Sequence, residues 1–299
     1  MNRREFVALA ASAPLVAQAM RPAAPGPFVC MHEVSSNGFD FRTAMEGYSK
    51  AGVRAVEVVL TKAREFADKD SPGGNPAVAR KLLDDLGLKA ASSSNHIGAI
   101  EPNPNRAKNL DDLKAKCELA QILGADKIVT IPAMTTKPAE DDYKRGVDNV
   151  REAADISGKY NVTLAIEFSR FFTFANTLTT ALTFVRNANH PHVRLMIDTY
   201  HFWIGPSKFE DLELLHDGEL MHMHFEDTPR EPVRELLEQR HRVLPGEGVA
   251  PLKKIVEAVK KKKYAGALSV ELMDPSFQSM DPYQLATKVR AAVEPLLNG

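Results

Sequence analysis

The 299-residue sequence predicts an α/β fold, specifically a (β/α)8 TIM barrel, and three observations support this prediction. Short apolar runs alternate with longer amphipathic segments from residue 28 onward, and eight such pairs can be counted. The short runs are apolar throughout, as in parallel strands that are buried on both faces. None is followed by the Gly-rich turn that a dinucleotide-binding, doubly wound sheet requires.

The expected strands are short and give way to polar residues at their ends. They cover residues 28–34, 53–59, 88–94, 126–131, 162–167, 193–198, 220–225 and 267–271. The expected helices cover residues 41–51, 76–86, 107–123, 141–157, 178–188, 209–215, 252–262 and 282–297. Gly52, Gly87, Gly124 and Gly158 each lie between a helix and the next strand, which is typical of a helix C-terminus. This order favours a closed barrel.

The first residues resemble an export signal. Arg3 and Arg4 precede an uncharged stretch, residues 7–19, that ends in the A-x-A sequence of a cleavage site. The stretch is too short for a stable membrane anchor, because crossing about 30 Å of hydrocarbon takes about 20 apolar residues. We therefore expect a twin-arginine-type signal peptide over 1–19, cleaved after Ala19, a linker over 20–27, a barrel domain over 28–299 and a periplasmic location.

The balance of charge argues against nucleic acid as a partner. The chain has 38 Lys and Arg residues against 39 Asp and Glu residues, a formal net charge of −1, and no long basic run. Affinity for a phosphate backbone through counterion release depends on an excess of positive charge. We therefore expect a small-molecule partner and no nucleic acid.

Polar side chains close four consecutive predicted strands. Glu167, Asp198, His224 and Glu271 each end, or lie next to the end of, an apolar run. Taken singly, each would fit a solvated strand end, but in a barrel of this kind all four ends lie at one rim. Buried carboxylates need a partner, and three oxygens with one nitrogen suit a divalent cation such as Mn²⁺, Mg²⁺, Co²⁺ or Zn²⁺. The sequence therefore predicts a metal centre at this rim.

Five short motifs resemble the xylose isomerase-like TIM barrel superfamily, whose members are described as sugar phosphate isomerases and epimerases. The motifs are Ile166-Glu167 and residues 197–201 (IDTYH), 222–227 (HMHFED), 245–248 (PGEG) and 269–271 (SVE). Their order is specific to the superfamily but not to one activity. The resemblance, which covers residue 28 to the C-terminus, implies that Glu167, Asp198, His224 and Glu271 hold one divalent ion, Mn²⁺ ahead of Mg²⁺, Co²⁺ or Zn²⁺. Barrels of this superfamily often pair into dimers, so the resemblance also makes a homodimer an expectation.

The resemblance implies a reaction as well. A divalent ion bound to adjacent carbonyl and hydroxyl oxygens stabilises the charge that develops when a neighbouring C–H proton is removed. Glu167 and Glu271 would be the paired catalytic acid and base. This predicts an isomerase or epimerase of a free or glycosidic keto-sugar, because phosphorylated sugars are cytoplasmic and the chain has no Gly-rich phosphate cradle. The alternatives are a lyase, either similar to inosose dehydratase or eliminating from 3-keto-glycosides, and a non-catalytic carbohydrate-binding barrel.

Further polar and aromatic residues near the rim are candidates for substrate contacts. His201 lies three positions after Asp198, where the epimerases have a residue that contacts the substrate. The other candidates end or follow predicted strands, or precede the Gly-rich turn: His32, Glu57, His96, Trp203, Arg240 and Arg242. Packing is the plainer interpretation of Trp203, as backbone hydrogen bonding is of His201. The motif favours His224 over His222 as the metal ligand, although strand periodicity places both on the same side.

One local difference argues against the activity of endonuclease IV, a DNA repair enzyme of the same superfamily. Its three-metal site has an Asp and a His shortly before the Gly-rich turn, where this chain has Arg240 and Arg242. Cationic side chains cannot replace metal ligands. These arginines can instead bind hydroxyl or carboxylate oxygens of a substrate, with surface salt bridges as the alternative.

Overall fold

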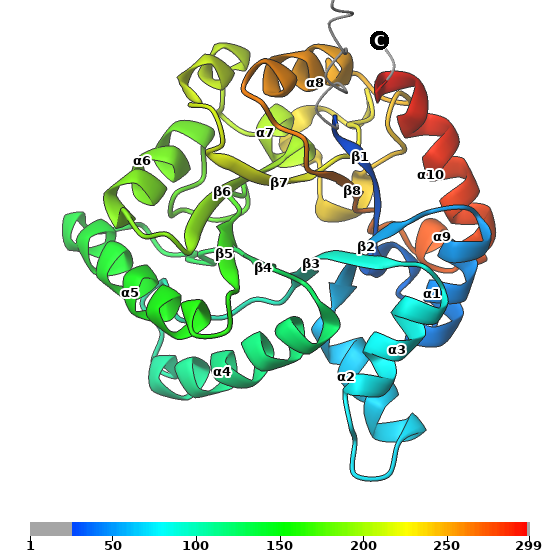
Figure 1. Ribbon diagram of the computed structural model, residues 1–299. Coiled ribbons are helices and arrows are strands. Elements are labelled where there is room, and N and C mark those ends of the chain that lie inside the picture. The colour runs from blue at the N-terminus through cyan, green and yellow to red at the C-terminus, as the bar shows by residue number, and fades with distance from the viewer. Residues whose placement is uncertain (1–25, 298–299) are drawn as a thin grey trace, which may run out of the picture.

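Eight parallel strands close into a barrel in the computed structural model, which describes residues 26–297 (Figure 1). Each strand pairs with the next in the chain, and β1 pairs with β8 to complete the ring. The strands are β1 (Phe28–His32), β2 (Ala55–Val59), β3 (Lys89–Ser94), β4 (Lys127–Thr130), β5 (Thr163–Ile166), β6 (Val193–Asp198), β7 (Leu220–His224) and β8 (Ala267–Val270). The predicted (β/α)8 fold is confirmed.

Helices surround the barrel on its outside (Figure 1). The α-helices are α1 (Phe41–Lys50), α2 (Leu60–Asp70), α3 (Ala77–Asp85), α4 (Arg106–Leu123), α5 (Glu140–Gly158), α6 (Leu178–Ala188), α7 (Thr199–Ile204), α8 (Leu252–Lys261), α9 (Pro275–Gln278) and α10 (Pro282–Leu297). The 3₁₀ helices are η1 (Glu33–Ser36), η2 (Phe209–Leu214), η3 (Arg234–Leu236) and η4 (Gln239–His241).

Two connections differ from the sequence prediction. Helix α2 follows β2 directly and was not predicted, because charged residues dominate it and only a narrow stripe that includes Leu60, Ala63 and Phe66 is buried. The short helix predicted over 209–215 is present as the 3₁₀ helix η2, which has a single buried residue, Leu212. A short segment with so little apolar surface to bury gains little from a longer helix.

Strand alternation separates an outer apolar layer from the interior of the barrel. Outward-facing residues such as Val56 and Val58 pack against the helices in one large cluster. Inward-facing residues form two smaller clusters of mostly small side chains: Cys30, Ala55, Ala91 and Ala267 in one, and Val129, Ala165 and Met196 in the other. The interior is thus filled by side chains, as in other barrels of this size, and is not a channel.

The same alternation brings polar residues to the carboxyl ends of the strands. Two positions after the inward-facing Met196 comes Asp198, which also faces inward. In the pairing of β6 with β7, Met196 is opposite His222 and Asp198 is opposite His224. His222 therefore lies one layer deeper in the barrel than His224, and only the upper layer reaches the rim.

The N-terminal predictions are not tested by the structure. The predicted signal peptide, 1–19, and nearly all of the predicted linker, 20–27, lie outside the described residues, so the domain boundaries stay predictions. Within residues 26–297, no helix has both the length and the apolar character needed to cross a membrane.

Candidate active site

Three carboxylates from different strand ends surround one nitrogen of His224. The Nδ1 atom of His224 lies 3.7 Å from Oε1 of Glu167, 3.7 Å from Oδ2 of Asp198 and 3.5 Å from Oε2 of Glu271. All four side chains are buried. The structure thus brings together the four residues that the sequence places at consecutive strand ends.

The donor set at this point fits a divalent cation. His224 Nδ1 is buried and has no hydrogen-bond partner, although three carboxylates face it. The separations exceed those of ordinary hydrogen bonds. An unpartnered imidazole nitrogen among carboxylate oxygens is unfavourable on its own, but it is the arrangement by which proteins bind Mn²⁺, Co²⁺ or Zn²⁺. The residues present could therefore hold one such ion.

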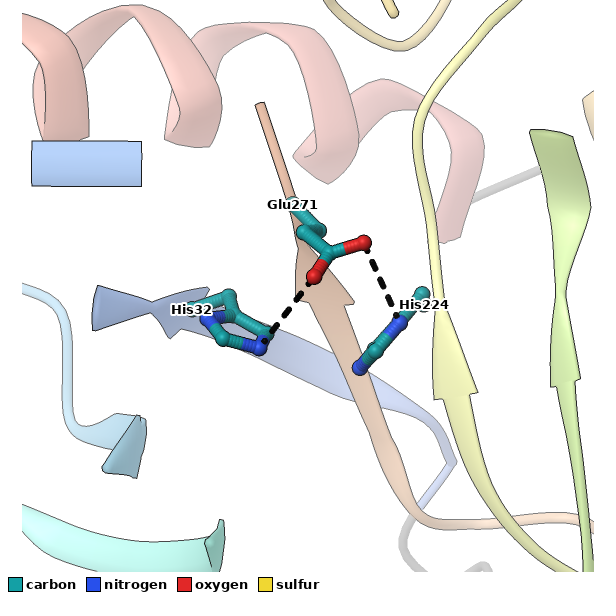
Figure 2. A group of neighbouring side chains, drawn as sticks. All are labelled: His32, His224 and Glu271. Atoms are coloured by element: carbon teal, nitrogen blue, oxygen red, sulfur yellow. Dashed lines mark ion pairs between the residues drawn. The ribbon is translucent and has the colours of Figure 1, made fainter. Parts of the chain in front are cut away.

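Glu271 connects this centre to β1. Figure 2 shows its carboxylate between His224 and His32, with one oxygen directed at each ring. The Nε2 atom of His32 lies 3.5 Å from Oε1 of Glu271. His32 is almost fully buried, and its Nδ1 accepts a hydrogen bond of 3.0 Å from the backbone N–H of Val34. That bond assigns the ring proton of neutral His32 to Nε2, toward the carboxylates.

Arg242 supplies the positive charge of the cluster. Its Nη2 lies 2.9 Å from Oδ2 of Asp198 and 3.2 Å from Oε2 of Glu271, and its guanidinium stacks on Tyr200 at 4.8 Å. The side chain is 1% exposed, so this ion pairing takes place away from water. Burying several carboxylates together is tolerable only with such a partner.

Burial and charge shift the pKa values of these groups in different directions. Burial raises the pKa of Glu167 to about 7, against the opposing pull of His224. Burial alone would raise the pKa of Asp198, but His201 and Arg242 hold it well below its usual range. Burial lowers the pKa of His201 to about 4, so this ring is neutral at pH 7. Neighbouring carboxyl groups with separated pKa values are typical of catalytic sites.

Local backbone structure fixes the orientation of Asp198. It is the last residue of β6 and the N-cap of α7, where its Oδ1 accepts a hydrogen bond of 2.7 Å from the backbone N–H of His201. The other oxygen, Oδ2, is thereby turned toward His224. The His201 ring is held by the Ser169 hydroxyl, 3.1 Å from Nε2, and lies 3.9 Å from Glu167.

The Gly-rich turn organises the loop that carries Arg242. Asp227, three positions after the end of β7, accepts hydrogen bonds from the backbone N–H groups of Thr228, Gly246 and Ala250. A Cβ atom at Gly248 would lie 2.2 Å from the carbonyl oxygen of Thr228, so only glycine fits there. These contacts explain the spacing between Asp227 and the PGEG turn, which both hold this loop in place.

A cavity of about 320 Å³ opens next to the cluster. Its lining includes both catalytic candidates, Glu167 and Glu271. It also includes polar residues that lie on or just after β1, β3 and β4: His32, Ser94, Asn95, His96 and Thr130. This volume is at the lower end of the range for small-molecule sites. At its wall, Nε2 of His96 lies 3.2 Å from Oε1 of the buried Glu101.

The residues predicted to contact the substrate lie in different parts of the structure. His201 and Arg242 lie inside the cluster, and His32 and His96 line the cavity. Glu57 is fully buried and pairs with His222, 2.6 Å away, and does not line the cavity within the described chain. The half-buried Trp203 does not line it either.

Arg240 and Arg242 differ sharply although they are two positions apart. Arg240 has an exposed side chain that pairs with Glu238 at 2.8 Å, whereas Arg242 is buried against Asp198. Arg240 lies within the 3₁₀ turn η4, whereas Arg242 is the residue that follows the turn. Among the contacts described for residues 26–297, none joins Arg240 to the four rim residues.

Three residues at the site were not predicted. Ser169 holds His201, Glu101 pairs with His96, and Glu226 lies 3.6 Å from Nε of Arg242. Glu226 lies two positions after His224 within the HMHFED motif, so its position was a usable signal. Ser169 and Glu101 lie in irregular segments with no comparable signal.

Comparison with known proteins gives the family. The profile of the xylose isomerase-like TIM barrel family matches residues 46–296. The chain belongs to this family. The resemblance seen in the strand-end motifs is therefore confirmed.

Relatives within the family have several activities. An inosose isomerase from Halalkalibacterium halodurans is 31% identical over 182 residues, 60% of this chain and 62% of that protein. A 3-dehydroshikimate dehydratase from Pseudomonas putida is 25% identical over 254 residues, 81% of this chain and 37% of that protein. A D-psicose 3-epimerase from Agrobacterium fabrum is 26% identical over 262 residues, 80% of this chain and 81% of that protein. The chain thus matches less than two thirds of the length of the inosose isomerase.

Solved structures confirm the fold. The crystal structure of the IolI protein with a bound zinc atom superposes with a TM-score of 0.82 at 22% identity, covering 90% of this chain and 98% of that one. At this identity the likeness speaks for the fold alone.

Proposed function

We propose that this protein is a metal-dependent isomerase or epimerase that acts on a keto-sugar or related polyol by removing a proton next to a carbonyl group. The observation that carries the proposal is the unpartnered Nδ1 of His224, faced by three carboxylates beside a cavity that Glu167 and Glu271 line. The inosose isomerase and epimerase relatives support this class of reaction.

Glu167, Asp198, His224 and Glu271 would hold the ion, with Mn²⁺ preferred and Mg²⁺, Co²⁺ or Zn²⁺ as alternatives. A bound divalent ion would stabilise the negative charge that develops on the substrate's carbonyl oxygen. The zinc atom in the related IolI structure supports a divalent ion of this kind.

Glu167 and Glu271 would move the proton. Both carboxylates line the cavity, so each can reach a bound substrate. Glu271 is held between two histidine rings, and Glu167 is buried beside the cavity, so both carboxylates are held in place next to a bound substrate. Return of the proton to the other face would give the epimer, and return to the neighbouring carbon would give the isomer.

The lining of the cavity favours an uncharged substrate. Its polar groups are hydroxyl, amide, imidazole and carboxylate groups, and none of the lining residues of the described chain is a Lys or an Arg. A phosphate group would need such partners or a helix N-terminus. A free or glycosidic sugar or cyclic polyol fits better. A substrate of this kind also fits the export predicted from the N-terminal residues. Export to the periplasm and the homodimer both remain proposals.

Solvent hydrogen exchange tests the proposal. The mature protein would be incubated in D2O with ketoses, inososes and 3-keto-glycosides, metal-loaded or treated with EDTA, and the sugars examined by proton NMR after the metal is removed. We expect metal-dependent deuterium uptake next to the carbonyl, with new peaks of an epimer or isomer. Peaks of an eliminated product would show a lyase. Affinity for a sugar without any uptake, in protein shown to bind metal, would contradict an enzymatic role and support a binding barrel.

A further inference from the structure

Glu57 lies beneath the candidate metal centre and contacts three histidines. It is in the middle of β2, opposite His32 in the pairing with β1, and its side chain is 0% exposed. Its Oε2 lies 2.6 Å from Nε2 of His222, and its Oε1 lies 3.3 Å from Nε2 of His224 and 3.5 Å from Nε2 of His32. A single buried carboxylate thus faces the same nitrogen of three rings.

These contacts determine where the ring protons lie. An ionised carboxylate can only accept hydrogen bonds, so each nitrogen that faces it within hydrogen-bond distance must donate. For His222 and His224 this places a proton on Nε2. A neutral imidazole carries one proton, so the lone pair of His224 is left on Nδ1. Nδ1 is the atom that faces Glu167, Asp198 and Glu271.

We propose that Glu57 is a positioning residue that keeps the ring proton of His224 on Nε2 and so presents the lone pair of Nδ1 to a divalent ion. The inference rests on the proposed function, because it assumes that the ion binds at Nδ1. It replaces the substrate contact expected for Glu57 from the sequence, since this side chain does not line the cavity in the described chain. Outer partners of metal-binding histidines fix their orientation and raise their basicity.

His222 holds Glu57 in place from the other side. It lies one layer below His224 on β7, and its Nε2 also lies 3.2 Å from the Ser92 hydroxyl. The chain from Ser92 through His222 and Glu57 to His224 crosses the barrel interior between β3, β7 and β2. It explains why two histidines stand two positions apart when only one faces the three carboxylates.

Metal affinity gives the first test and needs no substrate. Zn²⁺ binding to metal-stripped full-length protein would be measured by competition with a chromophoric chelator for the wild type, Glu57→Gln and Glu33→Gln. We expect Glu57→Gln to bind Zn²⁺ about 10–100-fold more weakly. Glu33→Gln is the matched control. Glu33 is equally buried, directly after β1, but accepts its hydrogen bond from the backbone N–H of Val59, so this variant should retain wild-type affinity.

The outcomes separate the two proposals. Wild-type protein that binds no Zn²⁺ would overturn the proposed function and this inference with it. A wild type that binds, with Glu57→Gln binding equally well, would overturn this inference alone.

The wild-type protein provides a second test that holds even if Glu57→Gln does not fold. Long-range ¹H–¹⁵N NMR of ¹⁵N-histidine-labelled protein with Zn²⁺ bound would locate the proton of the His224 ring. We expect the proton on Nε2 and the metal on Nδ1. A proton on Nδ1 with the metal on Nε2 would overturn the inference.

Discussion

The two halves of the barrel carry different kinds of side chain at the same rim. Strands β5 to β8 supply Glu167, Asp198, His224 and Glu271, which converge on one point. Strands β1 to β4 and the segments that follow them supply most of the cavity wall, including His96 and Thr130, and the buried Glu57 lies on β2. The difference fits our proposal, in which the second half would hold the ion and move the proton, whereas the first half would select the substrate and support the centre from below.

The largest effect is expected from removing a ligand in the second half. Asp198→Ala and His224→Ala should each bind a divalent ion more than about 100-fold more weakly. Loss of a residue that only supports a metal ligand already lowers metal affinity about 10–100-fold, and these variants lose a ligand itself. Deuterium uptake into the substrate should disappear with the ion. Elemental analysis after gel filtration, together with the D2O assay, checks both. Full metal occupancy in both variants would refute the metal centre.

A large loss of activity with the metal retained is expected at Glu167, the carboxylate that we propose transfers the proton. Glu167→Gln keeps an oxygen for the ion but cannot accept a proton at neutral pH, so kcat should fall about 10²–10⁴-fold. Single-turnover deuterium exchange and metal analysis of the same sample measure the two properties separately. Unchanged kcat would assign the proton transfer to another group.

A smaller effect, confined to substrate binding, is expected in the first half. His96 lines the cavity and is held by Glu101, so His96→Ala should raise KM about tenfold, the equivalent of one hydrogen bond of about 1.4 kcal/mol, and change kcat little. His216→Ala is the matched control, because His216 is an exposed histidine that precedes β7 at the opposite end of the barrel. A tenfold fall in kcat at unchanged KM for His96→Ala would contradict the division between the halves.

Glu33 should affect stability and not activity. Burial raises its pKa from 4.5 to about 8. Between these pH values the folded protein binds more protons than the unfolded chain, so the free energy of unfolding falls as pH rises through this window. Gln cannot ionise, so the free energy of unfolding of Glu33→Gln should not show this fall. As pH rises, the difference in the free energy of unfolding between the variant and the wild type should therefore shift in favour of the variant, by on the order of a few kcal/mol at pH 8. Urea denaturation between pH 5 and about pH 8.5 tests this; a stability difference from the wild type that does not vary with pH would contradict it. The exposed Glu118→Gln should follow the wild type.

The sequence predicted the strands and rim residues well because both depend on local patterns. Apolar runs located every strand, and a polar residue at the end of a parallel strand must lie at the carboxyl rim. Strand alternation also placed His222 and His224 on one side, but only the pairing of Met196 with His222 shows that His222 is the deeper of the two.

Contacts between distant segments could not be predicted in this way. Glu57 meets His222 and His224 across 165 and 167 positions of sequence, and nothing local to β2 indicates histidine partners. Arg240 and Arg242 look equivalent as neighbours in a loop, but the folded chain leaves Arg240 exposed beside Glu238 and buries Arg242 against Asp198. Helix α2 was missed because its buried stripe is narrow and its other residues are charged.

Anomalous diffraction from crystals soaked with Mn²⁺ or Zn²⁺ would locate the proposed ion. We expect one strong peak per chain within bonding distance of Nδ1 of His224, with oxygens of Glu167, Asp198 and Glu271 around it. A peak between Glu57 and His222, or no peak inside the barrel at saturating metal, would contradict the proposal.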